Sequence, residues 1–376
     1  MSEQEVDLQK QLPKRLKKVR GHLEKENLNA FLVSHQQNRY YLSGWMGDYE
    51  SGFVLITPKK SFILTDSRYS EHAIKNTVGF EVLEYDSQVA IFIRDLTKKL
   101  KIKRVGYESH DLSVFTFKRL QKYNSHLKFI PIAHLVEDVR SVKDKFEILK
   151  LKKVVELADQ AFRHILGFVK PGMTEAQVAW EMEKYMRERG AEKMAWNPFI
   201  VACGSHSSMA HYSAGNTKIK KNDMVLVDYG CVFDGYHSDT TRVFFVGNPT
   251  EEQKKIYNLV LEAQKLGESL IKEGENGAKV DKNVRKFLER YLPVGSQEQS
   301  IYRHSLGHGV GLQVHEEPRL SINSKNKLQA GNVVTVEPGV YVPGWGGIRL
   351  EDMVIVTKEG CEVLTKASKD IKKVVV

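Results

Sequence analysis

The spacing of hydrophobic and polar positions changes along the chain and predicts two successive domains. In the first part, short apolar runs at 29–34, 52–57, 61–65 and 80–84 alternate with stretches of helical spacing. Strands that alternate with helices are typical of an α/β fold, here with a sheet of parallel character. The polar segment around residues 140–145 precedes a long helical pattern. We therefore expect domains over residues 1–142 and 143–376.

The second domain has a different pattern, in which helices alternate with pairs of apolar strands. Thr174 with Gln177, and Thr250 with Gln253, have the spacing of capping boxes that begin helices. A further helix is expected over positions 280–291, with its apolar residues on one side. This pattern predicts an α+β domain whose strand pairs form a curved sheet covered by helices.

One predicted hairpin brings two acids together. Asp234-Gly235 favours a type I′ turn, which would place Gly230 opposite Asp239. Asp228 lies two residues from Gly230, so Asp228 and Asp239 would be diagonal neighbours on one face, roughly 7 Å apart at their β-carbons. That separation suits two carboxylates that share a metal centre. An acid near a turn is also often a simple cap or a solvated side chain.

Further acids and histidines occur downstream, each inside an apolar or glycine-rich stretch. They are His304, His308, His315, Glu337 and Glu351. Burying several such groups is costly unless they share a partner, and a pair of metal ions would provide one. Each histidine taken singly would more often be an ordinary surface or core residue.

These residues carry a resemblance to a known family. The set Asp228, Asp239, His308, Glu337 and Glu351 resembles the five-ligand site of the metallopeptidases that include aminopeptidase P, prolidase and methionine aminopeptidase. The resemblance covers the C-terminal two thirds and implies their pita-bread fold. Segments 38–45 and 65–69 resemble the non-catalytic creatinase/prolidase-like domain of the proline-specific branch. Methionine aminopeptidases usually lack that domain.

The resemblance implies a role for each ligand. Asp228 would bind one ion, His308 and Glu337 the other, and Asp239 and Glu351 would bridge both. An oxygen-rich ligand set suits Mn²⁺, with Co²⁺ or Zn²⁺ as alternatives. Two such ions can hold a bridging water as hydroxide and polarise a carbonyl, which implies amide hydrolysis. Glu337 would take the proton of that water.

The resemblance also implies roles for residues that are not ligands. His315 would donate to the developing oxyanion, and His211 and His304 would contact the substrate, so that His211 and His315 join Glu337 as catalytic residues. Arg319 matches an arginine of proline dipeptidases that suits a substrate carboxylate. Arg349 lies two residues before Glu351 and would orient that bridging carboxylate.

The leading hypothesis is a metal-dependent exopeptidase that hydrolyses the bond between an N-terminal residue and proline in short peptides. A dipeptidase restricted to Xaa-Pro is the alternative that Arg319 leaves open. A methionine aminopeptidase and a non-catalytic binding protein of the same fold are disfavoured by the N-terminal domain and by the complete ligand set. The resemblance also implies a homodimer, in which the aromatic run 40–45 would be exposed and wall off the site, unless it is core.

Composition limits the expected location, partners and cysteine state of the protein. The chain has 376 residues, of which 41% are hydrophobic and 28% charged, as in a globular protein with two cores. No apolar run approaches the ~20 residues of a membrane span, and no signal-peptide pattern begins the chain, so we expect a cytoplasmic protein. The net charge of +10 comes from lysines that alternate with apolar residues, so we expect no nucleic-acid partner. Three cysteines without zinc-site spacing predict reduced thiols.

Overall fold

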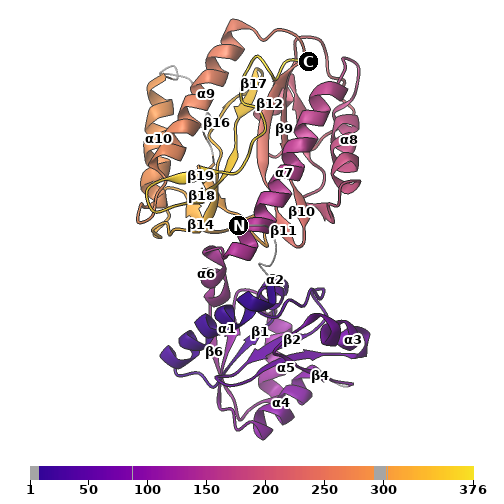
Figure 1. Ribbon diagram of the computed structural model, residues 1–376, viewed down its shortest axis with the longest axis vertical. Helices are drawn as coiled ribbons and strands as arrows, with labels where there is room; N and C mark the ends of the chain where they lie inside the picture. The colour runs from indigo at the N-terminus through magenta and orange to yellow at the C-terminus, as the bar shows by residue number, and fades with distance from the viewer. Residues whose placement is uncertain (1–7, 87, 292–301, 303) are drawn as a thin grey trace. The chain divides into compact units, whose positions relative to one another are not determined.

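The described chain consists of two compact units. The structure, a computed structural model, describes residues 8–86, 88–291, 302 and 304–376. Contacts between residues divide it into Met1–Arg140 and Ser141–Val376. Figure 1 follows the chain from indigo in the first unit to yellow in the second. None of the helices within these ranges has both the length and the apolar character that a bilayer crossing requires.

The first unit is an α/β fold around one six-stranded sheet. The strands are β1 (Ala30–Val33), β2 (Phe53–Ile56), β3 (Ser61–Thr65), β4 (Glu81–Glu84), β5 (Arg104–Glu108) and β6 (Lys128–Ile132). The helices are α1 (Leu8–Lys25), α2 (Gln36–Ser43), α3 (Ser67–Asn76), α4 (Val89–Lys99), α5 (Val114–Tyr123) and α6 (Leu135–Ser141). The sheet has the order β4-β3-β2-β1-β5-β6.

The sheet is mixed, whereas the sequence pattern predicted parallel character. Strand β2 runs antiparallel to both β1 and β3, while β3 with β4, β1 with β5, and β5 with β6 are parallel. The reason is the short link between β2 and β3, where the Thr57 amide donates to the Lys60 carbonyl at 2.8 Å. A parallel connection needs a crossover of about a dozen residues or more, which this turn does not provide.

The aromatic run that was expected to be exposed is buried. Tyr40, Tyr41 and Trp45 are 8%, 1% and 0% exposed. The guanidinium of Arg15 lies 4.1 Å from the Tyr41 ring centroid, and that of Arg39 lies 5.4 Å from the Trp45 centroid. These rings therefore form core and cation–π contacts within the first unit, so the alternative of core packing holds and the run is not an exposed wall.

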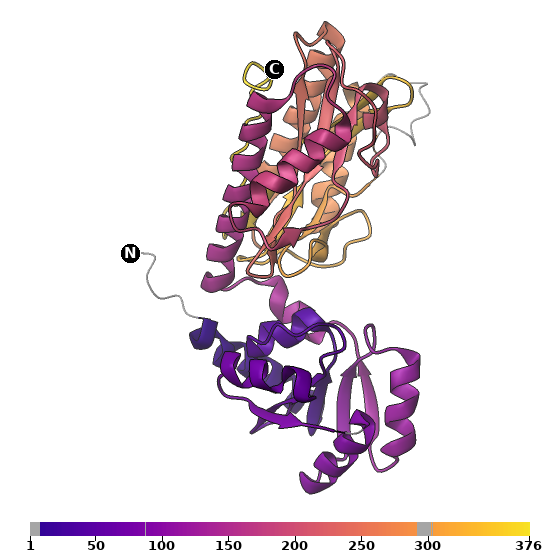
Figure 2. The same cartoon turned by 90° about the vertical axis from the view of Figure 1, so that its right-hand side faces the viewer.

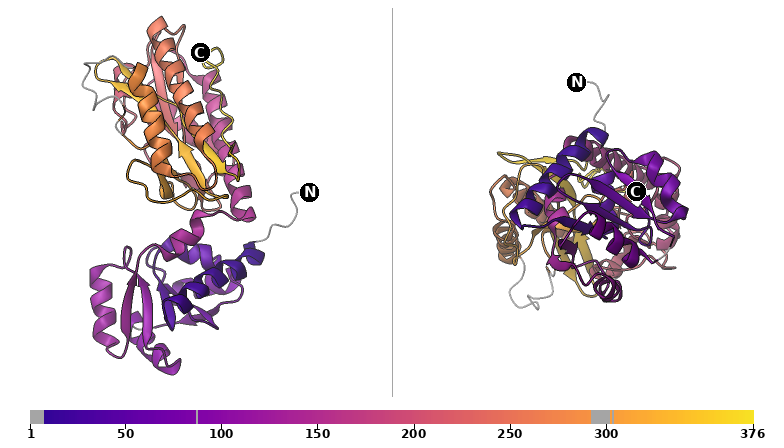
Figure 3. Two further views of the ribbon diagram at one scale, coloured as in Figure 1. Left: turned by 90° about the vertical axis from the view of Figure 1, so that its left-hand side faces the viewer. Right: turned by 90° about the horizontal axis from the view of Figure 1, so that it is seen from below.

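Four long helices cover the second unit. They are α7 (Lys145–Phe168), α8 (Glu175–Arg187), α9 (Glu251–Leu270) and α10 (Gly277–Tyr291). The capping boxes predicted at Thr174 and Thr250 are both present, and Asp144 with Glu147 forms a third at the start of α7. Figure 2 shows magenta α7 and α8 in front of the strands, and the left view of Figure 3, from the opposite side, shows orange α9 and α10 in front.

The strands of this unit pair antiparallel and form an α+β core between the helix pairs. One sheet has five strands in the order β14-β13-β15-β18-β19, two sheets have three strands in the orders β12-β9-β8 and β11-β10-β7, and β16 pairs with β17. The first half contains β7 (Lys193–Met194), β8 (Ile200–Cys203), β9 (Met224–Tyr229), β10 (Cys231–Phe233), β11 (Tyr236–His237) and β12 (Thr240–Phe245). The second contains β13 (Gly307–Gly309), β14 (Glu316–Leu320), β15 (Val333–Val336), β16 (Gly339–Val342), β17 (Gly346–Arg349), β18 (Asp352–Val356) and β19 (Cys361–Val363).

The hairpin that carries the first two acids has the predicted turn and register. Asp234 and Gly235 have φ of 49° and 78°, as a type I′ turn requires. Farther along the hairpin, Asp228 pairs with Thr241, two residues beyond Asp239. Because side chains alternate across a strand, this register directs Asp228 and Asp239 to one face.

The cysteines are free thiols, as predicted. Cys203 and Cys231 are buried, and Cys361 is half-buried. Burial raises the pKa of the Cys231 thiol to about 12, so this side chain is a small uncharged core group.

Candidate metal centre and substrate cavity

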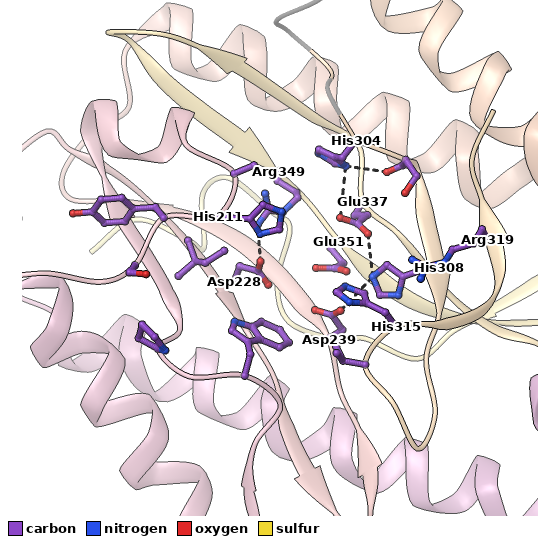
Figure 4. Close-up of a pocket in the computed structure, with 18 residues that line it drawn as sticks. His211, Asp228, Asp239, His304, His308, His315, Arg319, Glu337, Arg349 and Glu351 are labelled. Atoms are coloured by element: carbon purple, nitrogen blue, oxygen red, sulfur yellow. Dashed lines mark hydrogen bonds and ion pairs between the residues drawn. The ribbon is translucent and has the colours of Figure 1, made fainter. Parts of the chain in front are cut away.

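All the residues predicted for the site line one cavity of the second unit, with a volume of about 460 Å³ (Figure 4). The predicted residues that line it are His211, Asp228, Asp239, His304, His308, His315, Arg319, Glu337, Arg349 and Glu351. They come from both halves of the unit, since Asp228 lies on β9 and Glu351 on the link between β17 and β18. The fold therefore brings together side chains more than a hundred positions apart.

The five predicted ligands form two overlapping groups. Asp228, Asp239 and Glu351 each offer an oxygen, and these atoms all lie within 4.8 Å of one another. Ligand atoms of His308, Glu337 and Glu351 satisfy the same limit. Glu351 belongs to both groups, and His308 Nε2 lies 3.5 Å from Asp239 Oδ2, so the groups are adjacent.

The electrostatics of the cluster favour a bound cation. Burial, and then the charge of neighbouring carboxylates, raises the pKa of both Asp239 and Glu351 well above the ordinary range. Burial also raises the pKa of Asp228, whose Oδ1 is buried without a hydrogen-bond partner among the described residues. For Glu337, burial acts in the same direction, but the hydrogen bond from His308 and its charge outweigh it and lower the pKa to about 2.

The donor set fits divalent ions. Crowded carboxylates that are short of hydrogen-bond donors are stabilised by cations, and hard oxygen ligands with one imidazole suit a first-row ion such as Mn²⁺. The same distance limit also groups His315 with Asp239 and His308. The His315 ring lies edge to face on that of His308, with centroids 4.3 Å apart.

Arg349 orients an acid of the cluster, but that acid is Asp228 and not the predicted Glu351. Its Nη2 donates to Asp228 Oδ2 at 2.6 Å, and its Nε donates to Thr241 Oγ1 at 2.9 Å. The Thr241 hydroxyl in turn donates to Glu351 Oε2 at 2.8 Å. Arg349 thus orients Asp228 directly and reaches Glu351 only through Thr241. The side chain extends across to β9 and β12 rather than along its own strand.

The remaining histidines occupy different environments. His304 Nε2 lies 2.8 Å from the Tyr341 hydroxyl, its Nδ1 lies 3.8 Å from Glu337 Oε2, and burial lowers its pKa. Burial, followed by the positive charges of His308 and Arg319, lowers the pKa of His315 to about 4. At neutral pH both imidazoles are therefore uncharged, with one ring N–H to donate.

Several lining residues were not predicted from the sequence. They are Trp196, Pro198, Ile200, Ala210, Tyr212, Ser213, Ser305 and Val314. Tyr212 follows His211 directly, so its position was a usable signal. Trp196 and Pro198 lie in a loop segment outside the acidic clusters, and no local pattern pointed to them.

The fold and the site are those of a two-domain metallopeptidase. A sequence profile of metallopeptidase family M24 matches residues 150–358, and a profile of the creatinase/prolidase N-terminal domain matches residues 15–142. The chain belongs to metallopeptidase family M24. The predicted family and the two-part fold are thereby confirmed.

Similar proteins extend over nearly the whole chain. An uncharacterised peptidase of Bacillus subtilis is 36% identical over 357 residues, which are 95% of this chain and 99% of the relative. An Xaa-Pro dipeptidase of Bacillus anthracis matches in structure with a TM-score of 0.91 and 36% identity, over 97% of this chain and 100% of the other. An X-Pro aminopeptidase of Thermotoga maritima matches with a TM-score of 0.86 and 34% identity, over 94% and 100% of the two chains.

Proposed function

We propose that this protein hydrolyses the bond between an N-terminal residue and a following proline in short peptides. The observation that carries the proposal is the pair of ligand groups joined at Glu351, inside a cavity that also contains His211, His315 and Arg319. The similarity to an Xaa-Pro dipeptidase and an X-Pro aminopeptidase supports the substrate class. A proline nitrogen lacks N–H, so its bond requires a dedicated site.

Two divalent ions are proposed at the cluster, with Mn²⁺ as the first candidate. Asp228 would bind one ion, His308 and Glu337 the other, and Asp239 and Glu351 both. When bound, such ions supply a water activated at neutral pH and polarise the scissile carbonyl. The alignment of Asp228 depends on its ion pair with Arg349 at 2.6 Å.

The side chains around the ligands would handle protons and charge. Glu337 would accept the proton of the attacking water and pass it to the leaving nitrogen. The neutral His315 would donate a hydrogen bond to the carbonyl oxygen as negative charge develops there. His304 and His211 would contact the substrate on either side of this position.

Arg319 bears on the choice between two forms of the proposal. In an Xaa-Pro dipeptide the proline carries the terminal carboxylate, and the Arg319 guanidinium in the cavity would pair with it. In a longer peptide that carboxylate lies farther along the chain. The dipeptidase form is favoured by this positive charge, and the aminopeptidase form remains the alternative.

The test compares peptides that differ in one feature. We expect an Xaa-Pro dipeptide to be cleaved with added Mn²⁺, an Xaa-Pro-Yaa tripeptide more slowly, and an Xaa-Ala dipeptide hardly at all. Parallel assays with Co²⁺ and Zn²⁺ identify the preferred metal. Arg319→Gln should cost the dipeptide about tenfold or more in kcat/KM and the tripeptide much less. Cleavage of Xaa-Ala as fast as Xaa-Pro would contradict the proposed specificity.

A homodimer is proposed on the family resemblance. Light scattering should then give twice the chain mass of 43.0 kDa at assay concentrations. A mass of one chain under those conditions would reject the dimer and leave the peptidase proposal intact.

A further inference from the structure

A buried carboxylate outside the ligand cluster holds one wall of the cavity. Glu175 is the first residue of α8, and its side chain is 0% exposed. The wall is the loop after β8, which passes through the 3₁₀ helix Gly204–Ser208 and contributes Ala210, His211, Tyr212 and Ser213 to the cavity lining. Glu175 itself does not line the cavity.

Both carboxylate oxygens of Glu175 bond to this loop. Oε1 accepts from the Cys203 amide at 2.9 Å and lies 3.1 Å from His206 Nδ1. Oε2 accepts from the Tyr212 hydroxyl at 2.8 Å and from the Gly215 amide at 3.3 Å. One side chain therefore joins the beginning of the loop to its end. The loop has further contacts of its own, since the Ala214 amide donates to the Phe199 carbonyl at 3.4 Å and the Gly347 amide donates to Ser207 Oγ at 2.7 Å.

The position of the His211 side chain depends on this arrangement, because no hydrogen bond from another described residue holds it. Its imidazole is exposed, and none of the residues in the described ranges forms a hydrogen bond with it. Its neighbour Tyr212 bonds to Glu175 and lies against the His206 ring, with centroids 4.6 Å apart. The position of His211 over the cavity is thus set by the loop backbone on either side.

We propose that Glu175 is a positioning residue, which fixes the loop 203–215 so that His211 and Tyr212 face the substrate in the cavity. The inference rests on the proposed function, since the substrate contact of His211 belongs to it. Glu175 acts through the loop and touches neither the substrate nor the ligand cluster. A site held by such a support keeps its contact residues within a fraction of an ångström of their working positions.

The charge of Glu175 suits this task. Burial acts to raise the pKa of Glu175, but the bonds from the Cys203 amide and the Tyr212 hydroxyl outweigh it, and the pKa is lowered. The carboxylate is therefore ionised at neutral pH and can accept from donors on both oxygens. A glutamine has the same shape, yet its NH₂ group would face the backbone N–H of either Cys203 or Gly215.

The kinetic test is a double-mutant cycle with Glu175→Gln and His211→Ala, both in metal-loaded protein. We expect Glu175→Gln to lower kcat/KM for the Xaa-Pro dipeptide about 10- to 100-fold, mainly through KM, with metal content unchanged. In the His211→Ala background the same change should cost clearly less, because the His211 contact is gone and only the Tyr212 contact is left to be displaced. Equal costs in both backgrounds would overturn the positioning role.

Hydrogen exchange provides a test that does not need activity. Backbone amides of residues 204–216 should exchange faster in Glu175→Gln and in Tyr212→Phe than in the wild type. Tyr212→Phe removes only one of the four contacts to Glu175, so it provides the test if the Glu175 variant does not fold. Glu181→Gln is the matched control, since Glu181 lies on the same helix α8 but pairs with His164 at 2.8 Å. It should leave both the exchange of 204–216 and the kinetics unchanged.

The two tests separate the possible failures. If the wild-type protein does not cleave Xaa-Pro peptides but the loop loosens in both variants, the proposed function fails and the support by Glu175 stands. If loop exchange in both variants equals that of the wild type, the inference about Glu175 is wrong, whatever the activity.

Discussion

Glu108 in the first unit and Asp239 and Glu351 in the cavity of the second are all buried, but their surroundings are opposite. In the first unit, Glu108 is 1% exposed and surrounded by donors. Its Oε2 accepts from the backbone N–H groups of Ser34 and His35 at 2.6 and 2.7 Å, and its Oε1 accepts from the Asn38 amide at 2.5 Å. This acid belongs to a hydrogen-bond network that joins β5 to the start of α2.

In the cavity of the second unit, the acids face one another instead. Asp239 and Glu351 are 5% and 2% exposed, and their ligand oxygens lie within 4.8 Å of that of Asp228. Arg349 pairs with Asp228, and the Thr241 hydroxyl donates to Glu351, but Asp228 Oδ1 is buried with no partner in the described chain. Donors are therefore fewer than the acceptors that need them.

The difference shows how a structural acid and a ligand acid can be told apart. Burial raises the pKa of Glu108 to about 7, so one proton can neutralise it near physiological pH. For Asp239, burial and then repulsion from Glu351 and Asp228 raise the pKa. One proton cannot satisfy several adjacent carboxylates, whereas divalent ions can. A raised pKa alone therefore does not mark a ligand, since the charge of Glu137 also raises the pKa of Glu108. The difference is that Glu108 is surrounded by donors, whereas the cavity acids are short of them.

The largest effect is expected from removing a shared ligand. Asp239→Ala should lower kcat/KM at least about 10³-fold and remove bound metal, because this acid would contact both ions. Elemental analysis and Xaa-Pro cleavage measure the two effects. His315→Ala is the control within the cavity, expected to keep the metal and lose about 10²-fold in rate. An Asp239→Ala protein with full metal content and activity would remove Asp239 from the ligand set.

Asp239→Asn removes the charge of Asp239 but keeps its shape, and its effect on the free energy of unfolding tests the comparison. In chelator, Asp239→Asn should be more stable than the wild type by roughly 1–2 kcal/mol, because it relieves repulsion among the carboxylates. With metal restored, the order should reverse, since the wild type gains binding energy that the variant lacks. Thermal unfolding in chelator and in Mn²⁺ provides the four measurements.

Asp352→Asn is the matched control, because this acid is likewise buried, at 0% exposed, but is paired with Arg242 at 2.5 Å and with Lys369. It should destabilise the protein by roughly 3 kcal/mol with or without metal. If Asp239→Asn and Asp352→Asn behaved alike in chelator, crowding of the cavity acids would not be the reason for their raised pKa values.

What the sequence could predict depended on how local the cause is. The hairpin of Asp228 and Asp239 followed from the Asp234-Gly235 turn and the two-residue period of a strand, and both act within a dozen residues. The Thr174 capping box was equally local. The proposed ligand set could be assembled from the sequence because each acid or histidine lies in its own short motif, and the fold brings these motifs to one cavity.

The errors concern directions and partners that depend on distant residues. Strand β2 is antiparallel because of a short turn, and the spacing of apolar residues does not show that this turn reverses the strand direction. Arg349 shares spacing with Glu351, but its guanidinium reaches Asp228 on β9. Glu175 was not predicted, because its four loop contacts involve residues 28 to 40 positions away. Such contacts arise from tertiary packing and leave no periodic pattern in the sequence.

The smallest expected effect concerns Glu108 and completes the comparison. Glu108→Gln should leave metal content and activity unchanged, and at pH 6 it should destabilise the first unit by about 1 kcal/mol, because the new NH₂ group faces the Asn38 amide. The folded pKa of Glu108 is raised, so its contribution to stability is full below the unfolded pKa of about 4.3 and is lost as pH rises through about 7. The glutamine does not titrate.

Between pH 6 and pH 8, the free energy of unfolding of the wild type should therefore fall by roughly 1 kcal/mol relative to that of Glu108→Gln. The stability gap, which is the difference between these two free energies, then closes or changes sign. Hydrogen exchange of β1 and β5, corrected for the intrinsic effect of pH, reports on the first unit alone. Glu81→Gln on β4 is the control, since the Glu81 side chain is 53% exposed, and its gap should not change with pH. A stability gap between wild type and Glu108→Gln that stayed constant or widened toward pH 8 would contradict this prediction. It would mean that the donors of Ser34, His35 and Asn38 keep the acid ionised throughout, and that burial does not control the pKa of Glu108.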